Sequence, residues 1–134
     1  MLTHSGSCLC SKVRFEIGGV FHGFFLCHCS RCRKTSGSAH GANLFSKTEN
    51  FRWLAGEENV KTFRVPDSRF MTTFCDTCGS ALPTFDQGHL VVPAGSLDST
   101  VDLRPDGHIF VGSRAKWDHD LERVARFDSA PAMS

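Results

Sequence analysis

The sequence predicts an all-β protein made of short, twisted antiparallel strands, with at most a short helix near the C-terminus. Apolar residues recur at every second position in many short segments, which is typical of strands that bury one face. These segments are separated by glycine, proline, aspartate and asparagine, which favour turns.

The first predicted strand covers residues 12–17, where every second residue is apolar. The Gly18-Gly19 pair that follows suits the positive φ angles of a tight hairpin, so we expect residues 20–26 to return as the partner strand. Later strands are predicted at residues 41–45, 51–54, 60–65, 69–74, 81–85, 90–93 and 108–111.

Near the C-terminus, Trp117, Leu121, Val124 and Ala125 are spaced at i, i+4, i+7 and i+8, which predicts a short amphipathic helix. No internal repeat, low-complexity run or linker divides the 134 residues. Clusters of cysteines extend over the first 78 residues, and a domain boundary would separate them. We therefore predict one zinc-binding domain over residues 1–134.

The overall composition is ordinary for a water-soluble chain, with 40% hydrophobic and 22% charged residues. A formal net charge of +1 gives no reason to expect binding to nucleic acid or to a membrane surface. The first residues lack the basic and apolar segments of a secretion signal, so we expect a cytoplasmic protein. In that reducing compartment, metal binding explains the seven cysteines better than disulfides do.

The clearest local motif is Cys75-Asp76-Thr77-Cys78-Gly79. Two cysteines three positions apart, followed by glycine, form a turn that directs both sulfurs at one tetrahedral ion. A redox-active pair with this spacing would open a helix after a strand, whereas strands are predicted to follow here. We interpret the motif as half of a structural metal site.

The pair Cys8 and Cys10 can supply the other half. Joined to Cys75 and Cys78, it would complete a closed four-thiolate zinc site that ties the N-terminal segment to the middle of the chain. Such a site could contribute ~10 kcal/mol or more to folding, which exceeds the net stability of many small domains. The spacing alone leaves other groupings of the cysteines open.

Cys27, Cys29 and Cys32 form a second cluster. Three thiolates leave a fourth position on zinc, which is open in catalytic sites and filled by a protein ligand in structural ones. His28 lies between two of the cysteines, but the extended backbone of such a segment should point its side chain to the opposite face. Of the distant histidines, His40 or His108 could reach the site through the fold, so the spacing is consistent with an open or a closed site.

Arg31, Arg33 and Lys34 stand beside the second cluster. A zinc ion with three thiolates carries a formal charge of −1, which these cations can offset while attracting the carboxylates of a thiol ligand. A basic run of this kind fits a solvated loop face equally well.

Three longer motifs enclose these clusters: Gly6-Ser7-Cys8-Leu9-Cys10, Cys27-His28-Cys29-Ser30-Arg31-Cys32-Arg33-Lys34 with Ser36-Gly37-Ser38, and Phe74-Cys75-Asp76-Thr77-Cys78-Gly79-Ser80. Together they resemble the glutathione-dependent formaldehyde-activating enzyme family, which also includes centromere protein V. With weaker matches at 94–98, 108–111 and Trp117, the resemblance extends over residues 6–117 and includes all seven cysteines. Ser11 departs from the pattern, because many members have glycine there.

The resemblance implies a β-tent fold, shared with methionine sulfoxide reductase B, and two zinc ions per chain. It assigns Cys8, Cys10, Cys75 and Cys78 to a structural zinc and the other three cysteines to the zinc where chemistry occurs. The implied reaction joins glutathione, as co-substrate, to formaldehyde and gives S-hydroxymethylglutathione, formally a carbon–sulfur lyase reaction. We expect the glutathione thiol to take the fourth zinc position and His28 or His40 to protonate the product oxygen.

The expected partner of such an enzyme is a small-molecule thiol or aldehyde. Two other functions are consistent with the sequence. The first is a non-catalytic zinc-binding module that binds a protein partner through an apolar face drawn from the 12 phenylalanines. The second is a thiol redox enzyme, which would need a free thiol of low pKa. With all seven cysteines assigned to zinc, no such thiol remains.

Overall fold

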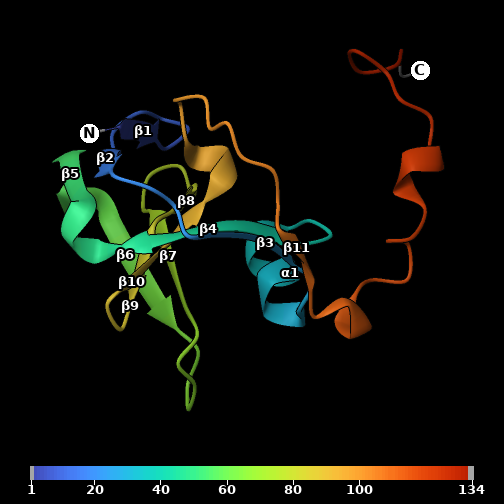
Figure 1. The fold of residues 1–134 in the computed structure, drawn as a ribbon, viewed down its shortest axis with the longest axis horizontal. Helices are drawn as coiled ribbons and strands as arrows, with labels where there is room; N and C mark the ends of the chain where they lie inside the picture. Colours follow the sequence, from blue (N-terminus) through green and yellow to red (C-terminus); the bar gives the residue numbers. More distant parts are fainter. Residues whose placement is uncertain (1, 133–134) are drawn as a thin grey trace.

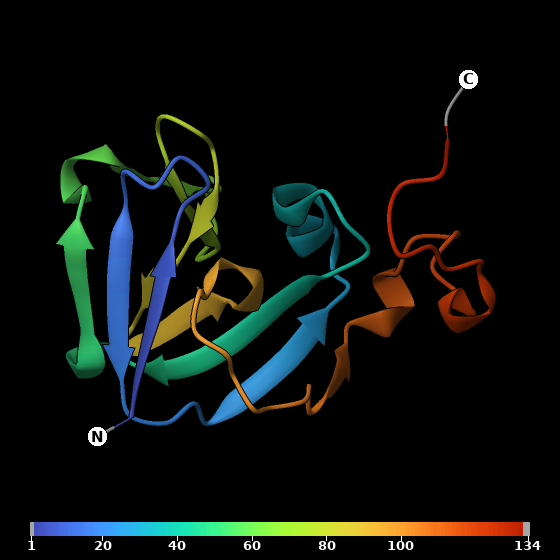
Figure 2. The same ribbon diagram turned by 90° about the horizontal axis from the view of Figure 1, so that it is seen from above.

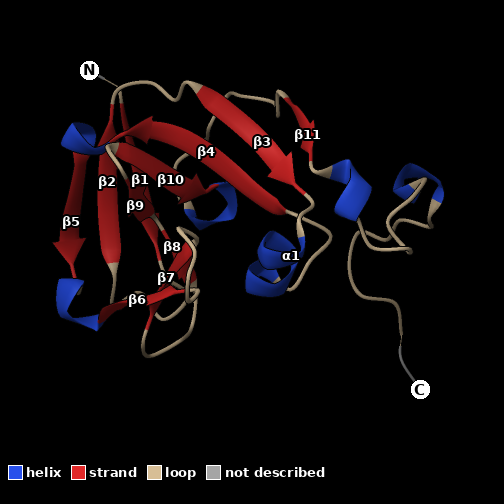
Figure 3. Ribbon diagram, turned by 90° about the horizontal axis from the view of Figure 1, so that it is seen from below, coloured by secondary structure: helices blue, strands red, loops and turns tan. Residues whose placement is uncertain are grey.

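The computed structural model describes residues 2–132. In this range the chain forms three β-sheets and one α-helix, which confirms the all-β class (Figures 1 and 3). No helix within these residues is long and apolar enough to cross a membrane.

The first sheet has the strand order β1-β2-β5 (Figure 2). Its strands are β1 (Thr3–Ser7), β2 (Arg14–Gly18) and β5 (Phe51–Ala55). β2 confirms the alternation seen in the sequence, because Phe15 and Ile17 are fully buried. β1 was not predicted, since its inward residues are His4 and Gly6 rather than large apolar side chains. Gly6 leaves room for Phe15, whose ring would overlap any Cβ at that position.

The second sheet has the order β11-β3-β4-β10-β9. Its strands are β3 (Gly23–Cys27), β4 (Gly41–Lys47), β9 (Thr84–Asp86), β10 (His89–Pro93) and β11 (Gly107–Ile109). All its pairings are antiparallel except that of β11 with β3, which is parallel. Leu44 of β4 and Leu90 and Val92 of β10 are fully buried, so the central strands carry much of the core.

The third sheet has the order β6-β7-β8. Its strands are β6 (Val60–Arg64), β7 (Met71–Cys75) and β8 (Ala81–Leu82). The segment predicted as one strand over 81–85 is divided at Pro83, which has no backbone N–H to donate to a ladder. After Pro83 the chain joins the second sheet as β9.

One hydrophobic cluster connects the three sheets. Its buried members are Cys8, Val13, Phe15, Ile17, Leu44, Cys75, Leu82, Leu90 and Val92. Two of them are cysteines of the predicted structural metal site, which therefore borders the core.

The hairpin predicted at Gly18-Gly19 is wrong. β2 pairs with β1 and β5, whereas β3 pairs with β4 and β11, so the two strands belong to different sheets. Gly19 does adopt a positive φ of 93°, but the bend carries the chain from one sheet to the next. The Gly19 N–H donates to the carbonyl of Leu2, which fixes that bend against β1.

The single α-helix lies elsewhere than the sequence indicated. α1 spans Ser30–Ser36, inside the second cysteine cluster, and the C-terminal pattern gives only a 3₁₀ turn at Leu121–Arg123. Trp117 is 60% and Val124 58% exposed, so no apolar surface within residues 2–132 covers these side chains. Figure 1 shows the C-terminal segment standing apart from the sheets. Without an apolar surface to pack against, the amphipathic pattern does not produce a helix.

The other 3₁₀ turns are Thr48–Asn50, Glu57–Asn59, Ala94–Ser96 and Val111–Ser113.

Candidate metal centres

The first cysteine group is assembled by two turns. Cys8 and Cys10 follow the end of β1, and Cys75 ends β7 with Cys78 in the turn after it. The four sulfurs lie within 4.8 Å of one another, so this group could hold a metal ion. Four sulfurs converging in this way match the tetrahedral donor set of a structural site.

Ser80 connects the two halves of this group, a role that the sequence did not reveal. Its hydroxyl accepts the N–H of Leu9 at 2.9 Å and lies 3.2 Å from the sulfur of Cys78. Hydrogen bonds that the side chain and then the backbone of Ser80 donate to the sulfur, with a further one from the Cys10 backbone, lower the pKa of Cys78 to about 5. Cys78 is therefore prepared as a thiolate, the form in which cysteine binds metals.

Ser11 follows the Cys8–Cys10 turn with a φ of 68°, a left-handed conformation that favours glycine. We therefore expect Ser11→Gly to raise the free energy of unfolding by about 1 kcal/mol, because glycine adopts this angle without strain. Urea unfolding of the metal-loaded protein measures the change. The control is Ser113→Gly, at an exposed position outside the residues of positive φ, which should give no gain. Equal effects of both substitutions would contradict the expectation.

The second group is built where β3 passes into α1. Cys27 ends β3, Cys29 is the N-cap of α1 and Cys32 lies in its first turn. The three sulfurs lie within 4.8 Å of one another and could hold a metal ion. The N–H of Cys32 donates to the sulfur of Cys29 at 3.4 Å, so the same sulfur caps the helix and faces the group. Among residues 2–132, no fourth histidine, cysteine or carboxylate joins the group.

The sulfurs of this group differ in their acidity. Burial raises the pKa of Cys27 and of Cys32 above the usual range. Burial is the largest single effect on Cys29 and opposes its ionisation as well, but hydrogen bonds from the Cys32 and Arg31 backbones and from the thiols of Cys27 and Cys32 together outweigh it and lower the pKa of Cys29. Two of the three thiols would thus stay protonated at neutral pH unless a cation displaced their protons.

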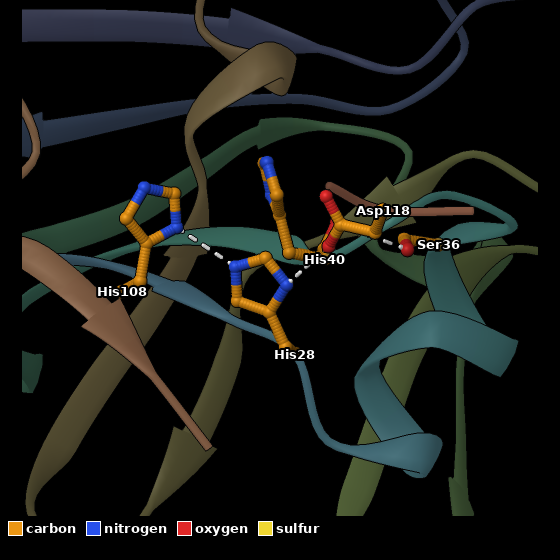
Figure 4. A network of polar contacts seen from close by, with 5 residues as sticks. All are labelled: His28, Ser36, His40, His108 and Asp118. Atoms are coloured by element: carbon orange, nitrogen blue, oxygen red, sulfur yellow. Dashed lines mark hydrogen bonds and ion pairs between the residues drawn. The ribbon is translucent and has the colours of Figure 1, made fainter. Parts of the chain in front are cut away.

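His28 joins a polar network with His108 and Asp118 (Figure 4). Its Nδ1 lies 2.8 Å from a carboxylate oxygen of Asp118, and its Nε2 lies 2.8 Å from Nδ1 of His108. The side chain is almost completely buried. This placement follows the extended geometry of the Cys27–Cys29 segment, and it leaves neither ring nitrogen of His28 within the sulfur group.

His40 lies beside this network. Its ring centre is 5.1 Å from that of His28, and Ser36 donates its hydroxyl to the His40 carbonyl at 3.2 Å. Burial, and then the neighbouring His28 and His108, lower the pKa of His40. The ring is therefore neutral at pH 7, and its Nδ1 is buried without a hydrogen-bond partner.

Asp118 was missed in the sequence because it lies 90 residues beyond His28 in an irregular segment without a motif. Its side chain is only 11% exposed and holds the start of the C-terminal segment against the His28 ring. The one available signal was its position directly after Trp117, where the family resemblance ends.

The three basic residues beside the second group differ in their surroundings. The guanidinium of Arg31 lies 5.8 Å from the ring centre of Phe70 and donates to Ser68 at 3.2 Å. Arg33 is half-buried and Lys34 is exposed. Within the described part of the chain, none of the three forms an ion pair, so their charge is available to an anionic ligand.

A cavity of about 230 Å³ adjoins the second group. It lies between α1, strands β4 and β10 of the second sheet, and strands β7 and β8 of the third. Cys32 is one of its lining residues. The second group thus borders a space that can admit a small molecule.

Comparison with known proteins gives a match to the family model described as "Glutathione-dependent formaldehyde-activating enzyme", over residues 3–113. The chain belongs to this family. A similar curated protein from Halomonas elongata is named "Putative glutathione-dependent formaldehyde-activating enzyme". It is 32% identical over 124 residues, which cover 84% of this chain and 77% of the relative.

The fold also resembles a crystal structure of a Rhodobacter sphaeroides protein, with a TM-score of 0.63 and 22% identity. The similarity covers 78% of this chain and 98% of that one, and it concerns the fold alone. The glutathione-dependent formaldehyde-activating family match includes both cysteine groups, His28, His40 and His108. Asp118 lies beyond it, so the family model does not account for the contact that this residue makes with His28.

Proposed function

We propose that the protein is a cytoplasmic zinc-dependent carbon–sulfur lyase that interconverts glutathione, a small aldehyde such as formaldehyde, and their S-hydroxymethyl adduct. Family membership supports glutathione and formaldehyde as substrates. The observation that carries the proposal is a group of three converging sulfurs, without a fourth protein donor in residues 2–132, that borders a cavity. Three protein ligands with an exchangeable fourth position are typical of catalytic zinc.

The two sulfur groups take different roles in this proposal. Cys8, Cys10, Cys75 and Cys78 hold a structural zinc, and Cys27, Cys29 and Cys32 hold a second zinc. When bound, the second zinc lowers the pKa of a thiol ligand and thereby supplies a thiolate at neutral pH. Arg31, Arg33 and Lys34 supply positive charge for the two carboxylates of glutathione.

The reaction needs one proton transfer. The carbon–sulfur bond forms as the carbonyl π electrons move to oxygen, and the proton lost by the thiol ends on that oxygen. His40 suits this transfer better than His28, because both nitrogens of His28 already face Asp118 and His108. A neutral His40 accepts the thiol proton and returns it to the oxygen.

Exchange spectroscopy by NMR tests the proposal by measuring how fast glutathione and formaldehyde interconvert with their adduct. The wild-type protein should exceed the spontaneous rate. His40→Gln removes the proton-transfer group, so the rate in excess of the spontaneous rate should fall by about 100-fold. A wild-type rate no faster than the spontaneous one would contradict the proposed activity.

Zinc affinity of the second group should fall steeply with pH. The raised pKa values of Cys27 and Cys32 mean that zinc must displace two protons there. Protons therefore compete with zinc as the pH falls, and the affinity should drop at least about 100-fold per pH unit, tenfold for each proton. Chelator competition between about pH 8 and about pH 6 measures the slope. A slope clearly below two protons would contradict this expectation.

A non-catalytic zinc module that binds a protein partner is the second candidate. Exposed apolar side chains along the C-terminal segment favour it, namely Phe110, Val111, Trp117, Leu121, Val124 and Phe127. Exposed apolar residues in this number are typical of interaction surfaces. The cavity beside Cys32 favours the enzyme, because a purely structural zinc needs no adjoining space.

A further inference from the structure

We infer that the cavity beside Cys32 is a subsite for the apolar substituent of the substrate, so that aldehydes with a short hydrocarbon chain, rather than formaldehyde alone, are accommodated. This inference rests on the proposed function and specifies its substrate class. It follows from the size of the cavity, the chemistry of its walls and its position next to the second cysteine group.

The size of the cavity exceeds what formaldehyde needs. Its volume of about 230 Å³ equals the space of roughly seven water molecules. Formaldehyde has only two non-hydrogen atoms and would leave most of this space empty. Conversely, complete ligands of drug-like size occupy pockets of ~300–1,000 Å³, so the tripeptide glutathione is too large to be enclosed here. A chain of several carbons fits the volume.

The walls are mostly carbon. They include Phe70 directly before β7, Met71 of β7, Leu82 of β8, and Val91 and Pro93 of β10. The buried Thr73 also lines the cavity, but its hydroxyl already contacts that of Thr84 at 2.9 Å. Hydrocarbon in contact with the carbon walls would gain from leaving water, whereas a polar group would depend for hydrogen bonds on the few polar lining side chains, such as Asn43.

The charged residues that line the cavity are at least partly exposed to solvent. The lining residue Arg69 is exposed and bonds through its guanidinium to the side chain of Gln87. Arg31 lies over the ring of Phe70, another lining residue. Asp86 lines the cavity as well, so the rim carries both signs of charge. The charged groups of glutathione would thus bind to charged residues at the rim and outside it. The interior of the cavity would hold the aldehyde substituent.

Gly41 places the cavity wall directly beside the cysteine group. It lines the cavity, and a Cβ there would lie 3.7 Å from the Cys32 sulfur, an ordinary contact distance. In the reaction, the glutathione sulfur bonds to the carbon of R–CHO and the carbonyl oxygen takes the thiol proton. The group R on that carbon then extends from the cysteine group into the cavity.

Binding of two stable analogues tests the inference on the zinc-loaded protein by calorimetry. S-hexylglutathione mimics the adduct of a longer aldehyde, with a methylene in place of the hydroxymethine, and S-methylglutathione lacks the chain. Each methylene buried from water tightens binding about fourfold, so S-hexylglutathione should bind at least about 30-fold more tightly than S-methylglutathione. Glutathione itself is measured in parallel.

Two variants test whether the hexyl chain binds in the cavity. Val91→Phe and Ala81→Phe each place a ring at a lining position, and Ala81 is exposed enough for its replacement to spare the fold. Each should reduce the preference for S-hexylglutathione to less than about threefold. Val20→Phe is the matched control at a residue that does not line the cavity, and it should keep the full preference.

The outcomes separate this inference from the proposed function. Failure of glutathione to bind overturns both. Binding of glutathione with equal affinities for the two analogues overturns the inference alone. A preference that persists in both cavity variants also overturns it, because the chain would then lie elsewhere.

Discussion

Replacing Cys75 with serine is expected to unfold the protein. Cys75 is fully buried, ends β7 and belongs both to the core and to the four-sulfur group. Serine is a poor zinc ligand, so the variant should lose the structural zinc and a contribution of ~10 kcal/mol or more. That contribution is comparable with the whole stability of a domain, ~5–15 kcal/mol.

Circular dichroism, the dispersion of amide NMR signals and zinc content measure this result together. The expected variant has a disordered spectrum and no bound zinc at the first group. Chelation of zinc from the wild-type protein should reproduce the same spectrum. A folded Cys75→Ser protein of near-normal stability would show that the first group is not a structural zinc site.

Cys29→Ser should have the opposite effect, with loss of thiol binding and a preserved fold. Cys29 is only half-buried and caps α1 by accepting the Cys32 N–H. Serine is among the best N-cap residues, so the helix keeps its cap while the second group loses a zinc ligand. The variant should retain one zinc ion and bind glutathione at least about 100-fold more weakly, since the thiol loses its metal partner.

Comparison with Cys75→Ser gives the control, because both changes replace one cysteine sulfur by oxygen. Thermal unfolding and glutathione titration are measured on each. If Cys29→Ser unfolds to the same extent as Cys75→Ser, the second group is structural and the catalytic proposal fails.

The sequence predicted β2 well, because the alternation of its apolar residues directly reflects one buried face. It did not predict β1, whose buried positions are His4 and Gly6. The packing of Phe15 against Gly6 makes this a strand, and no local pattern carries that information.

The positions of the helices likewise could not be predicted from local sequence patterns. α1 is too short, at seven residues, for a periodic pattern to appear, and its start is fixed by Cys29 within a metal-binding motif. The C-terminal segment does show a helical pattern, but its apolar side chains have no surface to cover. Helix formation depends on such tertiary packing more than on spacing.

For the candidate site, the sequence identified the cysteines, because ligand spacing is a local property. It also led us to expect that His28 would point away from the sulfurs. It did not reveal the partners of His28, since Asp118 and His108 reach it only through tertiary structure. The cavity beside Cys32 was likewise beyond prediction, because its walls come from α1 and from strands β4, β7, β8, β9 and β10, which are far apart in the sequence.

Native mass spectrometry of the purified protein, with and without glutathione, tests the central claim most directly. We predict two zinc ions per chain and one retained glutathione, with the glutathione and one zinc lost in Cys29→Ser. Two zinc ions with no retained glutathione would contradict an exchangeable zinc at Cys27, Cys29 and Cys32, and would favour the non-catalytic module.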